Sequence, residues 1–161
     1  MAERIKQRDA ERSKEQILQA AEALFAREGF RAGVDRIAAK SRLNKRMIYH
    51  YFGNKAGLWR AVLTRQYEKV ARVEADLSSK TSLADVTAEL IGRYHEFLAS
   101  DPHFVKILMQ ENLHDGRFVR KLPVARTKVP LLLALEKALR SGSATHLDPA
   151  QLLVDCLALC F

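Results

Sequence analysis

One short segment of the chain gathers residues that can bond nucleic acid. Lys45, Arg46, Tyr49 and His50 lie close together, with Met47 among them. Lysine and arginine can donate to guanine O6 and N7, and tyrosine and histidine can reach phosphates or base edges. This set of residue types predicts a surface that both positions a protein on DNA and reads its sequence.

The apolar residues around this segment indicate two short helices joined by a tight turn. Val34, Ile37 and Ala38 recur at i, i+3 and i+4, which makes one apolar stripe on the first helix. Ile48 and Phe52 lie four apart on the second helix and can pack onto that stripe. The polar residues of the second helix then point outward. This is the layout of a helix-turn-helix, whose second helix enters the major groove of DNA.

The charge of the chain is concentrated around this motif. Residues 1–70 hold 16 of the 27 lysines and arginines but only 8 of the 19 acids, so the whole net charge of +8 lies there. Between Gly29 and Tyr67 there are nine cations and a single acid, Asp35. Such a concentration is typical of a surface that binds phosphates.

The remaining polar residues do not form a recognisable catalytic or metal site. His95, His103, Glu111, His114 and Asp115 lack a ligand spacing such as HExxH, and the chain has neither a GxSxG elbow nor a glycine-rich phosphate loop. We therefore expect no catalytic residue, no metal and no cofactor. The sequence predicts a protein that is not an enzyme.

The two cysteines bear on the compartment and on a possible redox role. Cys156 and Cys160 share one face of a predicted helix, and no disulfide framework is present, which favours a reducing cytosol. A thiol switch is one reading. Packing is the better one, because no basic residue nearby would lower a thiol pKa. The sequence has no signal segment and no apolar run of about 18 residues, so we expect a cytoplasmic protein with no membrane partner.

The pattern of helices and breaks predicts an all-α protein in three parts. Residues 1–12 read as a flexible basic arm, and Ser13 is a candidate N-cap for the helix that follows. The DNA-binding domain is predicted at 13–65, with a long linking helix at 54–78 capped by Asn54. After a break at 78–82, residues 81–161 are predicted to form a helical domain for ligand binding and dimerisation.

The first 65 residues resemble the DNA-binding domain of the tetracycline-repressor (TetR) family. The resemblance is carried by Ile17–Ala21, Leu24–Phe30, Val34–Ala38, Lys45–Phe52 and Asn54–Leu58. It implies a homodimeric bacterial transcription regulator, usually a repressor that binds a palindromic operator and is released by a small molecule. It also implies a cytoplasmic protein that joins the nucleoid when bound to DNA.

The resemblance assigns DNA-binding roles residue by residue. Lys45, Arg46, Met47, Tyr49 and His50 occupy the recognition surface. Lys55 occupies the position of a phosphate-binding lysine, and Gly33 that of the N-cap of the first motif helix. Arg42 stands where the family has a glycine in the turn, so we expect it to adopt a positive φ. Gly57 replaces the acid that usually completes the cap of the long helix.

The second half supplies weaker expectations. Four polar residues could line an effector cavity: Arg93, Tyr94, Glu111 and His114. Four residues of the last apolar helix are candidates for a dimer interface: Leu153, Cys156, Leu157 and Cys160. The sequence ends within that apolar run, so we expect a truncated chain. The alternative function is a ligand-independent or architectural DNA-binding protein, which needs no cavity in residues 81–161.

Overall fold

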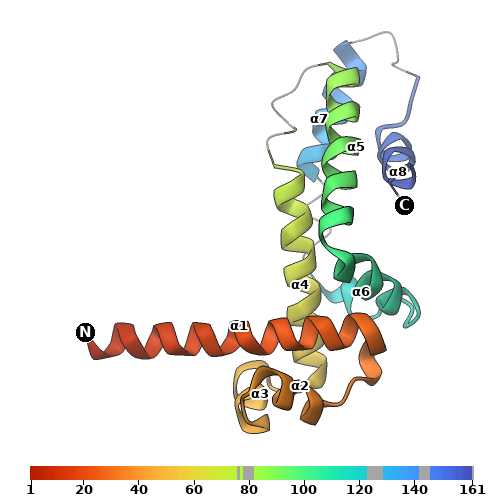
Figure 1. Ribbon diagram of the computed structural model, residues 1–161. Helices are drawn as coiled ribbons and strands as arrows, with labels where there is room; N and C mark the ends of the chain where they lie inside the picture. Colours follow the sequence, from red (N-terminus) through yellow and green to blue (C-terminus); the bar gives the residue numbers. More distant parts are fainter. Residues whose placement is uncertain (76, 78–81, 123–128, 142–145, 161) are drawn as a thin grey trace. The chain divides into compact units, whose positions relative to one another are not determined.

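The computed structural model describes residues 1–75, 77, 82–122, 129–141 and 146–160 (Figure 1). Over these ranges the protein is all-helical, as predicted, and contains no β-strand. The elements are α1 (Ala2–Glu28), the 3-10 turn η1 (Gly29–Arg31), α2 (Val34–Ser41), α3 (Lys45–Phe52), α4 (Lys55–Val73), α5 (Leu83–Ser100), α6 (Pro102–Asn112), the 3-10 turn η3 (Val119–Lys121), α7 (Val129–Ser141) and α8 (Pro149–Ala158).

The chain divides into two compact units. The first unit comprises Met1–Gln66 and His103–Leu122, and the second comprises Tyr67–Pro102 and Pro123–Phe161. The domain boundary expected near residue 80 therefore differs from the observed division, because α6 and η3 belong to the first unit. Ile107 and Phe118 are buried in the core of that unit, and this burial explains their grouping.

In the first unit, α1 packs across α2 and α3 (Figure 1). The predicted stripe of α2 is buried, with Ile37 fully inaccessible, and Ile48 of α3 is equally inaccessible. Phe25 of α1 meets Trp59 of α4 edge to face, with ring centroids 4.8 Å apart. Burying each such side chain contributes about 1.5–3 kcal/mol relative to leaving it exposed. The three-helix DNA-binding fold is thus held by one apolar core.

The prediction of a flexible arm at residues 1–12 is wrong, because helix α1 already begins at Ala2 and runs continuously to Glu28 (Figure 1). The segment contains mainly alanine, glutamate, glutamine, lysine and arginine, which are strong helix formers, and it has no glycine or proline. Ser13 is not an N-cap. Its hydroxyl donates to the carbonyl oxygen of Asp9 at 2.9 Å, inside the helix.

Helix α4 begins with the predicted cap. The Asn54 side chain accepts a hydrogen bond from the backbone N–H of Gly57 at 2.8 Å. A Cβ atom at Gly57 would lie 1.9 Å from the carbonyl oxygen of Phe52, so only glycine fits where the family usually has an acid. This close approach explains the missing capping acid.

Helix α4 ends at Val73, earlier than the predicted residue 78. The Arg93 guanidinium donates to the carbonyl oxygens of Val73 and Ala75, at 3.1 and 2.6 Å. These bonds satisfy carbonyls left open at the helix end and stabilise the stop there. The last residues of the predicted helix, 76 and 78, lie outside the described residues.

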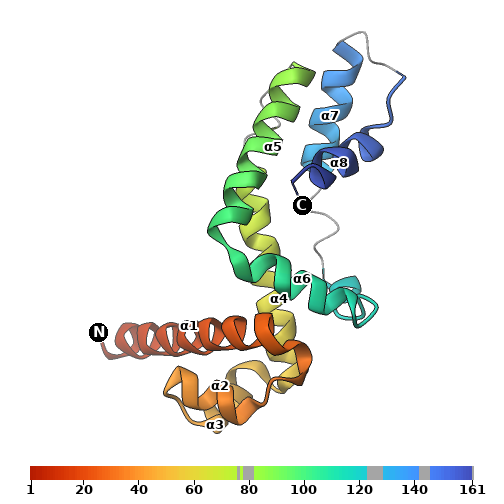
Figure 2. The same cartoon turned by 45° about the vertical axis from the view of Figure 1, so that its right-hand side comes forward.

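The second unit packs α5, α7 and α8 together (Figure 2). Leu90, Leu135, Leu139 and Leu153 are buried between them. Asp148 caps α8, since its carboxylate accepts the N–H of Gln151 at 2.7 Å and proline follows it in the first turn.

Candidate nucleic-acid interface

The recognition helix α3 is shaped by one cap and one buried residue. The Asn44 side chain accepts the N–H of Met47 at 2.9 Å and starts the helix. Ile48 is fully buried, which turns the opposite face of α3 outward. Four predicted contact residues are exposed on the helix: Lys45, Arg46, Tyr49 and His50. Met47 is partly buried and packs against the core, so its side chain is less available than the other four.

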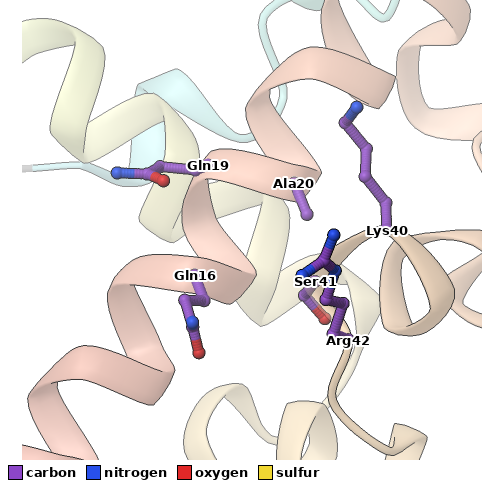
Figure 3. A pocket seen from close by; sticks show the side chains of 6 residues that line it. All are labelled: Gln16, Gln19, Ala20, Lys40, Ser41 and Arg42. Atoms are coloured by element: carbon purple, nitrogen blue, oxygen red, sulfur yellow. The ribbon is translucent and has the colours of Figure 1, made fainter.

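The turn before α3 adopts the strained conformation expected for Arg42. Its φ of 57° and ψ of 28° lie in the left-handed region, where a side chain carries a conformational cost. A hollow of about 380 Å³ lies beside it, lined by Gln16, Gln19, Ala20, Lys40, Ser41 and Arg42. Figure 3 shows Ser41 and Arg42 on one side of this hollow and the residues of α1 on the other.

Gly33 precedes α2 with an extended backbone, as the N-cap position requires.

Lys45 at the start of α3 forms an ion pair with Asp35 of α2. Its Nζ lies 2.9 Å from one carboxylate oxygen. The hydrogen bond and the charge of Asp35 raise the pKa of Lys45 above its ordinary value. Both side chains are exposed, so the pair is open to exchange with a phosphate or a base.

Lys55 opens α4 and lies over an aromatic ring. Its Nζ is 4.9 Å from the ring centroid of Phe30 in the η1 segment. Burial lowers the pKa of Lys55 below its ordinary value. The sequence singled out the lysine but not the ring beneath it, although Gly29-Phe30 lay within the motif that carried the family resemblance.

The four residues considered for an effector site fall into different units. Arg93 and Tyr94 lie in the second, where Arg93 bonds the end of α4 and the Tyr94 hydroxyl donates to Glu74. Burial and the Glu74 carboxylate raise the pKa of Tyr94. Glu111 and His114 lie in the first unit, where Glu111 is fully buried. Effector binding by any of them stays a prediction.

The residues considered for a dimer interface lie on α8 or next to its end. Leu153 and Cys156 are buried within the second unit, while Leu157 and Cys160 are partly buried. Burial raises the pKa of both thiols, which agrees with packing rather than a reactive pair. The large apolar side chains that α8 and its end expose are Val154 and Leu159. The dimer interface itself stays a prediction.

A short basic helix exposed beside a tight turn, on a three-helix core, defines a helix-turn-helix DNA-binding protein. The family models agree with this geometry. Residues 17–62 match the bacterial regulatory proteins of the tetR family, and residues 85–161 match the tetracyclin repressor-like C-terminal domain. The chain belongs to the TetR family of bacterial regulatory proteins.

Individual relatives agree with the family. The chain is 37% identical over 121 residues to the HTH-type transcriptional repressor NicS of Pseudomonas putida, covering 73% of this chain and 56% of that protein. It is 36% identical over 110 residues to the repressor SCO4008 of Streptomyces coelicolor, covering 68% and 54%. The chain thus spans about half the length of the curated relatives it matches.

Solved structures share the fold. The transcriptional regulator SCO4942 of Streptomyces coelicolor is similar with a TM-score of 0.75 at 26% identity, covering 91% of this chain and 76% of that one. The fatty acid degradation regulator FadR of Bacillus halodurans has a TM-score of 0.68 at 19% identity, covering 91% and 79%. This family is not one of enzymes, in agreement with the missing catalytic motifs. Among the described helices, none has the length and apolar character needed to span a membrane.

Proposed function

We propose that this chain is a ligand-responsive transcriptional repressor that binds a palindromic operator as a homodimer and leaves it when a small molecule binds. The observation that carries the proposal is the exposed basic face of α3, with Ile48 buried behind it. The repressor names of both curated relatives support repression as the direction of control.

DNA recognition in this proposal divides into reading and positioning. Lys45 and Arg46 open the recognition helix, where N-terminal residues approach base edges. Tyr49 and His50 follow one turn later and can bond bases or phosphates. Lys55, at the start of the next helix, binds a backbone phosphate. Gly33, Arg42 and Met47 complete the proposed surface.

The homodimer and the effector are supported by general physical arguments. One recognition helix reads only a few base pairs, so operator specificity needs two copies about one helical turn of DNA apart. An effector releases DNA when it favours a different spacing, with a coupling of about 1–3 kcal/mol typical of such systems. In the second unit, a surface hollow of about 300 Å³ lined by Arg72, Val73, Arg93, Glu96, Phe97 and Ser100 is one candidate effector site.

Selection of DNA from a random pool by the purified protein tests the proposal. We expect a selected sequence with twofold symmetry. Alanine at Lys45 or Arg46 should relax the preference at particular base positions and weaken binding to the best site roughly tenfold or more. The matched control is alanine at exposed Arg140 in the second unit, which should change neither. Equal losses on operator and random DNA would show that Lys45 and Arg46 do not read bases.

A further inference from the structure

Arg117 is a second cation that lies over the Phe30 ring, which Lys55 also contacts. The guanidinium carbon of Arg117 is 5.6 Å from the ring centroid of Phe30, and it is 4.8 Å from that of Phe118. Lys55 Nζ lies 4.9 Å from the same Phe30 centroid. Two cations more than sixty positions apart in sequence therefore share one ring within the first unit.

The turn that carries Arg117 is held by the buried carboxylate of Glu111, through the two residues that follow Arg117. One oxygen of Glu111 accepts the N–H groups of Phe118 and Val119 at 2.8 and 2.9 Å. The other accepts the indole N–H of Trp59 at 2.7 Å. Glu111 is fully buried, so this arrangement fixes the turn after α6 against helix α4. Arg117 lies in that fixed turn, directly before the first N–H that Glu111 holds.

The charge of Arg117 is open to a partner outside the chain. Its residue is exposed, and within the described residues no carboxylate pairs with it. Some arginines of this unit are instead paired with carboxylates, as Arg36 is with Glu28 and Arg65 with Glu15. A guanidinium held on an aromatic face keeps its outer N–H groups for an anion, and its planar fork matches phosphate.

We propose that Arg117 is a second phosphate-binding residue of the DNA interface, acting beside Lys55. The inference rests on the proposed function, because it takes Lys55 to bind the DNA backbone. The partner is a phosphate of the same duplex that α3 reads. The turn after α6 then contributes directly to the DNA surface, although its sequence lies far from the helix-turn-helix.

The test is the salt dependence of DNA binding by Arg117→Gln, measured by fluorescence anisotropy with operator and random duplexes. Each neutralised phosphate contributes about 0.9 to the log–log slope, so we expect the slope to flatten by up to about 0.9 on both sequences. Arg117→Lys keeps the charge and should keep the slope. The matched control is Lys106→Gln, which removes an exposed cation from α6 and should leave the slope unchanged.

Two further variants separate this inference from the proposed function. Lys55→Gln should also flatten the slope, and Arg117→Glu should weaken binding more than Arg117→Gln does. A flattened slope in Lys55→Gln with wild-type slopes in both Arg117→Gln and Arg117→Glu would overturn the role of Arg117 alone. Absence of DNA binding by the wild-type protein would overturn the proposed function instead. Thermal unfolding followed by circular dichroism verifies that each variant is folded.

Discussion

The Nζ of Lys45 lies 2.9 and 3.1 Å from the two carboxylate oxygens of Asp35, which joins the first turn of the recognition helix to the first turn of α2. Asp35 is the only acid in the sequence between Gly29 and Tyr67. Asp35 is therefore the ion-pair partner of Lys45 when DNA is absent. Binding DNA through Lys45 requires exchanging this partner for a base or a phosphate.

Replacing Asp35 by asparagine should strengthen DNA binding. The change removes a negative charge from the basic surface and releases Lys45, so we expect a gain of a few-fold on operator and random DNA alike. The gain should shrink as salt rises, because screening weakens an exposed charge. Titration of both duplexes by anisotropy at two salt concentrations measures it.

Asp85→Asn is the control for this prediction. Asp85 is exposed in the first turn of α5, in the second unit, and its loss changes the net charge by the same amount. It should leave affinity nearly unchanged. Weaker operator binding by Asp35→Asn would contradict the prediction and would mean that Asp35 positions Lys45 for base reading.

The lowered pKa of Lys55 predicts a loss of DNA affinity on the alkaline side. Because burial lowers its pKa, Lys55 loses its proton at a lower pH than an ordinary lysine does, and the phosphate contact weakens as pH rises through that value. Lys55→Arg stays protonated throughout and should show a flatter decline above neutral pH. Identical pH profiles for the two proteins, measured with one duplex, would rule out this contribution of Lys55.

The local features of the motif could be predicted from the sequence because they depend on neighbouring residues. The spacing of Val34, Ile37 and Ile48 predicted the buried faces, and Asn54 was predicted as the cap of the long helix. The positive φ of Arg42 followed from the glycine expected in its place. These features require no knowledge of distant contacts.

The features that were missed are of two kinds, one set by local helix propensity and the others by distant contacts. The helical start of α1 was missed because propensity, not apolar periodicity, carries it. The early end of α4 depends on Arg93, twenty residues further along the chain from Val73. Glu111 was interpreted as a possible ligand contact, since nothing in the sequence pairs it with Trp59.

Glu111 should be a determinant of stability in the first unit. Its two oxygens face three N–H donors, so in Glu111→Gln the amide nitrogen must face at least one of them, donor against donor. We expect the free energy of unfolding to fall by about 1–3 kcal/mol, as for a buried group left unsatisfied. Urea unfolding monitored by circular dichroism measures the change.

Glu136→Gln is the matched control for Glu111→Gln. Glu136 pairs with Arg140 one turn along α7, at 2.6 Å, and the arginine is largely exposed. Losing such a pair should cost at most about 0.5 kcal/mol. Equal stability losses in the two variants would show that the Glu111 bonds contribute no more than a surface pair.

The proposed homodimer can be tested on α8, where inward and outward apolar residues differ in burial. Leu153 is 7% exposed and packs within its own unit, whereas Val154 is 58% and Leu159 75% exposed. Glutamate at both Val154 and Leu159 should weaken self-association without unfolding the unit, because neither side chain fills its core. Leu153→Glu should unfold the second unit, because a charge would be buried without a partner.

Sedimentation velocity over a range of protein concentrations distinguishes these results, and Gln151→Glu on the same helix is the control for added charge. A Val154→Glu/Leu159→Glu protein as strongly dimeric as the wild type would place the interface elsewhere.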